Sequence, residues 1–258
     1  SAAPLEDALV HDSFRKTLDP SPPTTCLETS MSDEITLNID GIEIKTEPGK
    51  MIIQAAIDAG IYIPYLCYYP GMKSFGACRM CVVEIEGGPP GTPASCTTPV
   101  AEGMEVSTKS DKLQGLRRGI MELLLSEHPH GCLTCHRVEL CGPADICLRH
   151  VTVNDRCVTC PKNERCELKD TVRYLEMDMD TPLTYNNRHL SLEVKDPLWE
   201  MDMNLCIVCA RCVRACDEVR GDSAITLQSR SGRTLIGTSQ GTSLLESECE
   251  FCGACIDV

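Results

Sequence analysis

Cysteine is the most informative residue type in this sequence, because 19 of its 258 residues are cysteines. The densest stretch runs from His128 to Cys166. It holds one group spaced His-x3-Cys-x2-Cys-x5-Cys and another spaced Cys-x9-Cys-x2-Cys-x5-Cys, made of His128, Cys132, Cys135, Cys141, Cys147, Cys157, Cys160 and Cys166. Thiolates are soft ligands that bind iron–sulfur clusters and zinc. Eight such residues are enough for two [4Fe-4S] clusters, and the alternative is a pair of structural zinc sites.

Two further groups of cysteines flank this stretch. The earlier group has the spacing Cys-x10-Cys-x2-Cys-x14-Cys and consists of Cys67, Cys78, Cys81 and Cys96. The later group repeats Cys-x2-Cys-x2-Cys and consists of Cys206, Cys209, Cys212, Cys216, Cys249, Cys252 and Cys255. The earlier spacing disfavours a zinc ribbon, which would need two Cys-x2-Cys pairs.

Composition limits the setting in which these cysteines act. Aromatic residues make up only 4% of the chain, so we expect bound metals to supply stability that its core lacks. The net charge of −14 and the pI of ≈ 4.8 disfavour nucleic acid as a partner. No secretory signal or membrane-length apolar segment is evident. Since disulfides need an oxidising compartment, we expect metal-bound cysteines in a cytoplasmic protein without a membrane span.

The elements that position the first cysteines are mostly β-strands. Residues 35–39 and 42–46 alternate in polarity around Asp40-Gly41, which predicts a hairpin. Residues 51–60 predict a short helix that Gly60 closes. Residues 82–86 and 104–108 predict two more strands.

A longer helix is predicted over residues 110–126, between the first and second cysteine groups. Ser110 is a suitable N-cap, with Asp111 in the first turn. The helical spacing predicts one apolar face that packs as core, formed by Leu113, Leu116, Ile120, Leu123 and Leu124. Further along, we interpret Trp199 as a packing residue.

The order of hairpin, helix, cysteine loop and returning strand resembles a β-grasp ferredoxin with a [2Fe-2S] cluster. Its cysteine spacing is similar to that of the domain that begins the large iron–sulfur subunit of NADH:quinone oxidoreductase (respiratory complex I). The matching domains of iron-only hydrogenases and NAD-dependent formate dehydrogenases are also similar. The resemblance implies that the four cysteines from Cys67 to Cys96 are the cluster ligands.

The His128-to-Cys141 group matches the motif that binds a [4Fe-4S] cluster with one histidine ligand in these families. In their simplest pattern a Leu-Gln pair follows the third cysteine, whereas here the near match is Leu168-Lys169, after Cys166. This implies an inserted second site with the ligands Cys147, Cys157, Cys160 and Cys166. The alternative pairing uses Cys147 in the first set and a histidine in the second, with the candidates His130, His136 and His150.

The last group resembles the bacterial two-cluster ferredoxin, in which the fourth cysteine of each run binds the other cluster. Cys216 would then join Cys249, Cys252 and Cys255. The fourth ligand for Cys206, Cys209 and Cys212 would follow Val258. Cys26 is given no role and His128 is counted as a ligand, so the chain offers nineteen ligands in total. Five clusters with four ligands each need about twenty. We therefore expect this chain to be the leading part of a longer protein.

The resemblance implies an α+β chain with four parts: an extension (1–30), a β-grasp [2Fe-2S] domain (31–108), a loop and helix domain with two [4Fe-4S] sites (109–200), and a shortened 2×[4Fe-4S] ferredoxin (201–258). It implies one [2Fe-2S] and four [4Fe-4S] clusters, with a molybdenum or tungsten pterin only if a further domain follows.

The implied function is electron transfer in a NAD(H)-linked oxidoreductase complex, most like the formate dehydrogenase type. Partners would be a flavin- and NADH-binding subunit and other redox subunits. The alternative is a non-catalytic electron-transfer subunit of an NAD-linked hydrogenase or NADH:quinone oxidoreductase type complex. A zinc-bound scaffold is a third interpretation. No residue in the sequence suggests a catalytic acid, base or nucleophile, and no glycine-rich phosphate loop is evident.

Overall fold

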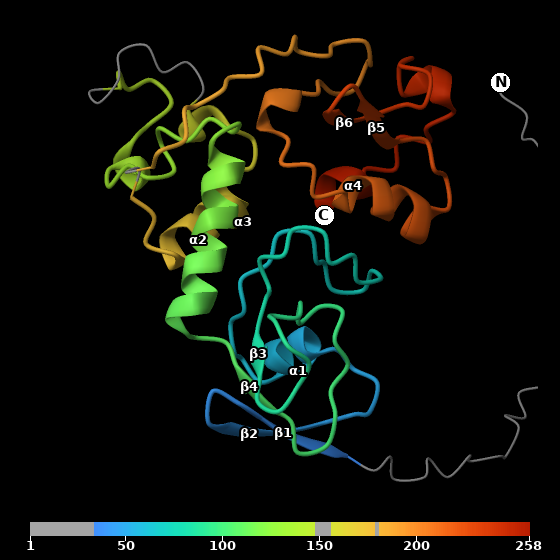
Figure 1. The fold of residues 1–258 in the computed structure, drawn as a ribbon. Helices are drawn as coiled ribbons and strands as arrows, with labels where there is room; N and C mark the ends of the chain where they lie inside the picture. The colour runs from blue at the N-terminus through green and yellow to red at the C-terminus, as the bar shows by residue number, and fades with distance from the viewer. Residues whose placement is uncertain (1–33, 148–155, 179–180) are drawn as a thin grey trace, which may run out of the picture. The chain divides into compact units, whose positions relative to one another are not determined.

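The computed structural model describes residues 34–147, 156–178 and 181–258 (Figure 1). The predicted N-terminal extension with Cys26, and the spare histidine His150, lie outside these residues. From residue 34 onward the described chain belongs to one compact unit.

A four-stranded sheet forms first, in the strand order β2-β1-β4-β3. Its strands are β1 (Ile35–Ile39), β2 (Ile42–Thr46), β3 (Glu84–Ile85) and β4 (Glu105–Ser107). β1 pairs antiparallel with β2 and parallel with β4, and β3 pairs antiparallel with β4. The turn residues Asp40 and Gly41 have positive φ, 53° and 84°, which is type I′ geometry. The predicted hairpin is confirmed.

The third strand is shorter than its sequence suggests. We expected residues 82–86 to be extended, but only Glu84 and Ile85 form β3. Val82 makes an isolated bridge to Ala94 instead. Because the prolines of the loop at 87–93 have no N–H to donate, they cannot continue a ladder opposite this segment. The chain next to Cys81 is therefore left as a loop.

Helix α1 (Ile52–Asp58) packs against this sheet (Figure 1). Ile52 and Ile53 are completely buried and contribute to the same core as Leu37 of β1. Gly60 follows the helix with a φ of 72°, a left-handed conformation that glycine adopts without strain. The predicted helix and its closing glycine are confirmed.

Helix α2 (Asp111–Leu125) begins where the sequence predicts. The hydroxyl oxygen of Ser110 accepts a hydrogen bond from the Leu113 N–H at 3.2 Å, so Ser110 is the N-cap. The predicted apolar face is partly wrong, because Leu116 and Leu123 are 43% and 64% exposed. The helix buries a face of residues four apart instead, namely Leu113, Arg117, Met121 and Leu125.

Arg117 explains why the buried face is rotated from the prediction. Its side chain is fully buried and donates hydrogen bonds to three backbone carbonyls, those of Met80 at 3.2 Å, Thr108 at 2.9 Å and Val82 at 2.7 Å. A buried guanidinium is stable only when its donors are satisfied. Those carbonyls lie on the loop that carries Cys81 and just after β4, so Arg117 fastens α2 to the first cysteine loop.

Between α2 and residue 200 the described chain consists mainly of loops and short helices. The helical elements are η1 (Val138–Leu140), η2 (Cys157–Thr159), η3 (Asn163–Arg165) and α3 (Glu167–Tyr174). Leu168 and Val172 of α3 pack with Met121 and Leu125 of α2 in a second core. Met80, from the first cysteine loop, belongs to that core too. The first two groups of cysteines are therefore joined through shared packing.

The C-terminal part contains short helices around a two-stranded sheet. Its elements are η4 (Met203–Leu205), α4 (Arg211–Arg214), η5 (Ala215–Arg220), β5 (Thr226–Arg230), β6 (Arg233–Gly237), η6 (Leu245–Ser247) and α5 (Ala254–Asp257). The hairpin β5–β6 was not predicted. Its signal was Ser231-Gly232, which turns with φ of 51° and 77°.

A third core holds this part together. It contains Cys216, Ile225 and Leu244, and Trp199 packs against it. The rings of Trp199 and Phe251 lie 5.2 Å apart between centroids, which agrees with the predicted packing role of Trp199. None of the described helices is long and apolar enough to cross a membrane.

Candidate iron–sulfur sites

The first four cysteines are brought together by the loops that follow α1 and precede β3 and β4. Three of them, Cys67, Cys81 and Cys96, are almost completely buried, and Cys78 is half-buried. The thiols form two hydrogen-bonded pairs, Cys67 with Cys78 and Cys81 with Cys96. The Cys78 N–H also donates to the sulfur of Cys67 at 3.5 Å. The structure thus gathers the four thiols that the sequence predicts as [2Fe-2S] ligands.

The same pairing controls which of these thiols ionise. A hydrogen bond from the Cys78 thiol lowers the pKa of Cys67 to about 5, and one from Cys96 lowers the pKa of Cys81 to about 6. The donating thiols of Cys78 and Cys96 have raised pKa values, first because of these hydrogen bonds and then because of burial. Thiolates are the form of cysteine that binds metals. One member of each pair, Cys67 or Cys81, is therefore ionised and able to bind a metal at neutral pH. This donor set fits an iron–sulfur cluster.

Backbone geometry keeps the first cysteine loop tight. Gly76 has a φ of 68°, and a Cβ there would lie 3.0 Å from Cγ2 of Thr97. Arg79, between Cys78 and Cys81, also has a positive φ of 56°. Its guanidinium donates to the Thr92 carbonyl at 3.1 Å. The loop is therefore held in a conformation that few side chains tolerate, as is common at functional sites.

The cysteines of the central stretch converge less tightly. Burial, together with the neighbouring charges of Cys132, Cys166 and Cys160, raises the pKa of Cys157 to about 12. The structure therefore places Cys157 near Cys132 of the predicted first set and near Cys160 and Cys166 of its own set. Cys135, Cys141 and Cys147 are half-buried.

His128 lies just after α2, with its Nδ1 atom 2.8 Å from the carbonyl oxygen of Pro129. Histidine ligands of metals commonly bond a backbone carbonyl through the second ring nitrogen. The position of His128 therefore fits the predicted ligand role. Which ligands share a cluster between His128 and Cys166 stays a prediction.

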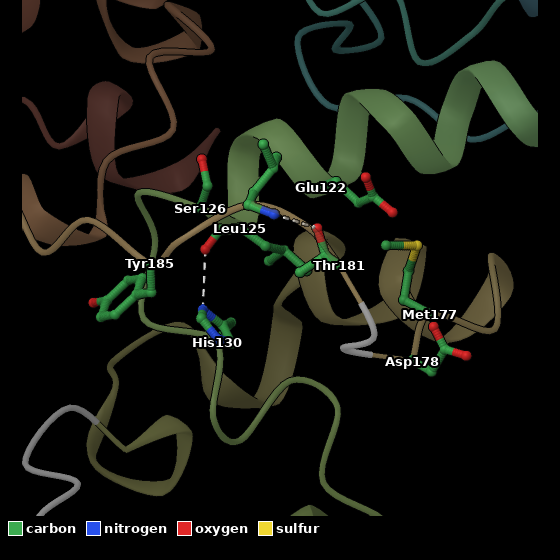
Figure 2. Close-up of a pocket in the computed structure, with 9 residues that line it drawn as sticks. Glu122, Leu125, Ser126, His130, Met177, Asp178, Thr181 and Tyr185 are labelled. Carbon is green, nitrogen blue, oxygen red and sulfur yellow. Dashed lines mark hydrogen bonds between the residues drawn. The ribbon is translucent and has the colours of Figure 1, made fainter.

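The spare histidines have different surroundings. Figure 2 shows His130 beside the end of α2, where its Nδ1 lies 3.0 Å from the Leu125 carbonyl oxygen. Its ring meets that of Tyr185 edge-on, with 4.8 Å between centroids. These two residues border a cavity of ≈ 160 Å³, which is also lined by Glu122, Leu125, Ser126, Met177, Asp178, Thr181 and Leu183. His136 is exposed. None of the described cysteines lines this cavity.

The C-terminal cysteines separate into two neighbouring groups. Burial, together with the charges of Cys209, Cys206 and Cys255, raises the pKa of Cys212 to about 12. Burial also raises the pKa of Cys249, and the nearby charge of Cys216 contributes to this increase. The structure places Cys216 near Cys249 and Cys255, the arrangement that crossed ligation would need.

The two runs repeat the same backbone conformation, which the sequence alone did not reveal. Val208 and Phe251, each two residues after the first cysteine of its run, have φ of 55° and 52°. The Val208 N–H donates to the sulfur of Cys206 at 3.3 Å, and the Phe251 N–H to that of Cys249 at 3.4 Å. A β-branched residue at positive φ is a true outlier, and N–H groups aimed at sulfur suit an anionic cluster. The repeated geometry supports equivalent roles for the two runs.

Sequence reasoning also missed a set of basic residues beside the cysteines. The charge of Lys169 favours the thiolates of Cys157 and Cys166, opposing their burial. Lys169 is itself buried, and its ammonium donates to the Asn163 carbonyl at 2.8 Å. In the same way, the positive charge of Arg188 favours the thiolate of Cys206, and that of Arg214 favours the thiolate of Cys67. No spacing rule in the sequence links Arg188 and Arg214 to their thiols, because those contacts are made by tertiary packing.

Among the described residues, no three His, Cys, Asp or Glu side chains are placed to hold a single metal ion. None of the eighteen described cysteines forms a disulfide.

Three family models match successive parts of the chain. Residues 32–111 match a 2Fe-2S iron-sulfur cluster binding domain. Residues 117–150 match the NADH-ubiquinone oxidoreductase-G iron-sulfur binding region, and residues 196–258 match the ferredoxin-like domain of NADH-quinone oxidoreductase subunit 3. The three matches follow the order in which the cysteine groups occur.

Similar proteins extend these matches over most of the chain. The NADPH-Fe(3+) oxidoreductase subunit alpha of Geobacter sulfurreducens is 35% identical over 86% of this chain and 23% of its own length. The mitochondrial NADH-ubiquinone oxidoreductase 78 kDa subunit of Neurospora crassa is 33% identical over 80% of this chain and 24% of its own. The chain thus spans about a quarter of the length of these curated relatives.

A solved structure is also similar. It is the crystal structure of an NAD+-reducing [NiFe]-hydrogenase in the H2-reduced state, with a TM-score of 0.64 and 28% sequence identity. The match covers 81% of this chain and 77% of that one.

Proposed function

This chain is related to the iron–sulfur subunits of NADH-linked oxidoreductases, and from that premise we propose that it is the electron-transfer segment of such a complex. The observation that carries the proposal is the convergence of the four buried thiols from Cys67 to Cys96 within residues that match a [2Fe-2S] domain. Iron–sulfur clusters bound at these cysteines would pass electrons singly between a partner flavin site and another redox site. The chain's own residues hold, orient and electrically tune those sites.

We assign five sites to the ligands. One [2Fe-2S] site uses Cys67, Cys78, Cys81 and Cys96. Two [4Fe-4S] sites use the sets His128, Cys132, Cys135, Cys141 and Cys147, Cys157, Cys160, Cys166. A third [4Fe-4S] site uses Cys216 together with Cys249, Cys252 and Cys255. A fourth uses Cys206, Cys209 and Cys212 together with one further ligand. The matched region 117–150 contains His128, Cys132, Cys135, Cys141 and Cys147, so it includes the complete first set of either pairing.

Substituting His128 with cysteine tests the histidine set. A thiolate adds negative charge where neutral imidazole had none, so the reduced state becomes less favourable. We expect the reduction equilibrium of that cluster to fall at least about tenfold, or about 59 mV, in an EPR-monitored redox titration. The matched control is His136→Cys, at an exposed position, which should leave every potential unchanged. Equal shifts in the two variants would exclude His128 as a ligand.

The relatives help to choose between types of complex. The sequence most resembled the formate dehydrogenase type, and that finer assignment stays a prediction. The names of the relatives described above contain ubiquinone, iron(III) or hydrogenase, and none contains formate. They favour the alternative, an electron-transfer subunit of an NADH:quinone oxidoreductase or NAD-linked hydrogenase type complex. A flavin- and NADH-binding subunit is the partner that either assignment requires.

The decisive experiment measures iron and acid-labile sulfide in anaerobically purified protein, with EPR of the dithionite-reduced sample. About eighteen irons per chain would match one [2Fe-2S] and four [4Fe-4S] clusters. About fourteen would mean that the Cys206, Cys209 and Cys212 site stays empty without its further ligand. Little iron with stoichiometric zinc would refute the electron-transfer proposal and favour a zinc-bound scaffold.

A further inference from the structure

Helix α4 presents two buried arginines to the segment that carries Cys67. Arg211 and Arg214 are three residues apart, so they lie on one face of the helix, and only 5% and 8% of their surfaces are exposed. Two buried guanidinium groups in a four-residue helix need a reason, because desolvating a charge is costly. Their contacts differ in a way that separates their roles.

Arg214 contacts the first iron–sulfur site directly. Its Nη1 donates to the backbone carbonyl of Cys67 at 2.9 Å. Its guanidinium carbon lies 5.4 Å from the centre of the Phe75 ring, a cation–π distance. The same side chain therefore holds both ends of the 67–75 segment against α4, the helix that contains Cys212.

The charge of Arg214 is only partly compensated. Its Nε lies 3.4 Å from a carboxylate oxygen of Glu218, a long contact for a charged pair. The other oxygen of Glu218 accepts from the Lys73 N–H at 2.8 Å, which shares its negative charge with the backbone. The Nη2 of Arg214 is buried without a hydrogen-bond partner among the described residues. A net positive field therefore remains beside Cys67.

Arg211 is the contrasting neighbour. It forms an ion pair with Glu167, and its guanidinium carbon lies over the rings of Tyr65 and Tyr69, 5.8 Å and 5.6 Å from their centres. Its Nε and Nη2 also lack hydrogen-bond partners among the described residues. Its charge, however, is balanced by the whole carboxylate of Glu167. Within the described residues no hydrogen bond joins Arg211 to a cysteine. Arg211 packs the same segment, but its net field at Cys67 is weaker.

We propose that Arg214 is a positioning residue that raises the reduction potential of the Cys67–Cys96 cluster and fixes that site against α4. The inference rests on the proposed [2Fe-2S] function of those cysteines. Reduction adds one negative charge to a cluster, and a nearby cation stabilises the added charge, most strongly where burial limits screening by water and salt. Net charge and hydrogen bonding near the sulfurs are established levers on cluster potential.

The test is an EPR-monitored redox titration of the holoprotein and three variants. Arg214→Gln keeps a hydrogen-bond donor on a shorter side chain but removes the charge, and we expect the reduction equilibrium of the [2Fe-2S] signal to fall about tenfold, or about 59 mV. Arg214→Lys keeps the charge and should retain most of the wild-type potential. Arg211→Gln, the matched control, should shift it by less than half as much.

The outcomes separate this inference from the function on which it rests. A wild-type protein without a [2Fe-2S] signal would overturn both. A wild-type signal whose potential is the same in Arg214→Gln, or moves equally in Arg211→Gln, would overturn the inference and leave the function standing. If Arg214→Gln fails to keep its cluster, Glu218→Gln supplies the opposite test, because removing the opposing carboxylate should raise the potential. An unchanged or lower potential in that variant would overturn the proposal.

Discussion

Replacing Cys81 with alanine should abolish the [2Fe-2S] EPR signal and lower the iron content by about two atoms per chain. Cys81 is 1% exposed and is hydrogen-bonded to Cys96 in the centre of the first site. Alanine removes a ligand from a buried position that water cannot fill, and the remaining thiols cannot complete a four-ligand site. Iron analysis and EPR of the reduced protein measure both effects.

Cys26→Ala is the matched control for this experiment, because it also exchanges cysteine for alanine but at a position without a predicted role. It should keep the full iron content and every EPR signal. Retention of the [2Fe-2S] signal in Cys81→Ala would show that Cys81 is not a ligand. An equal loss of iron in both variants would show that the loss does not depend on this site.

Replacing Arg117 with alanine should destabilise the protein by about 3–5 kcal/mol, at the upper end for single substitutions. The substitution leaves three backbone carbonyls without their donor and opens a cavity between α2 and the first cysteine loop. Each buried polar group that loses its partner costs about 1–3 kcal/mol. Urea unfolding of the holoprotein, followed by circular dichroism, measures the loss.

Arg118→Ala is the control on the same helix. Arg118 is exposed, and within the described part of the chain its side chain donates one hydrogen bond, from Nε to the Leu175 carbonyl at 3.0 Å. Its removal should cost less than about 1 kcal/mol, because water can replace the lost donor. If the two variants lose similar stability, the three carbonyl contacts of Arg117 do not support the fold as described.

Local patterns in the sequence were enough to predict several elements. The β1–β2 hairpin follows from Asp40-Gly41, since a two-residue turn with positive φ strongly selects such residues. The start of α2 follows from Ser110, whose hydroxyl satisfies a backbone N–H three residues ahead. Cysteine spacing predicted the groups because a Cys-x2-Cys turn brings its thiols together with little help from the rest of the chain.

Other features were decided by tertiary packing. Leu116 and Leu123 were expected in the core, but Arg117 occupies the buried face of α2 because carbonyls from distant parts of the chain accept its hydrogen bonds. The β5–β6 hairpin escaped prediction, although Ser231-Gly232 was its signal.

The sequence by itself determined which residues are predicted to bind iron and in what order they occur along the chain, because thiol chemistry and spacing are local properties. Only the tertiary structure decided which charges surround them. Lys169 lies three residues from Cys166, but Arg214 reaches Cys67 from 147 residues away. The field at a buried site depends on distance and desolvation in space, and neither quantity can be read from the spacing of residues along the chain.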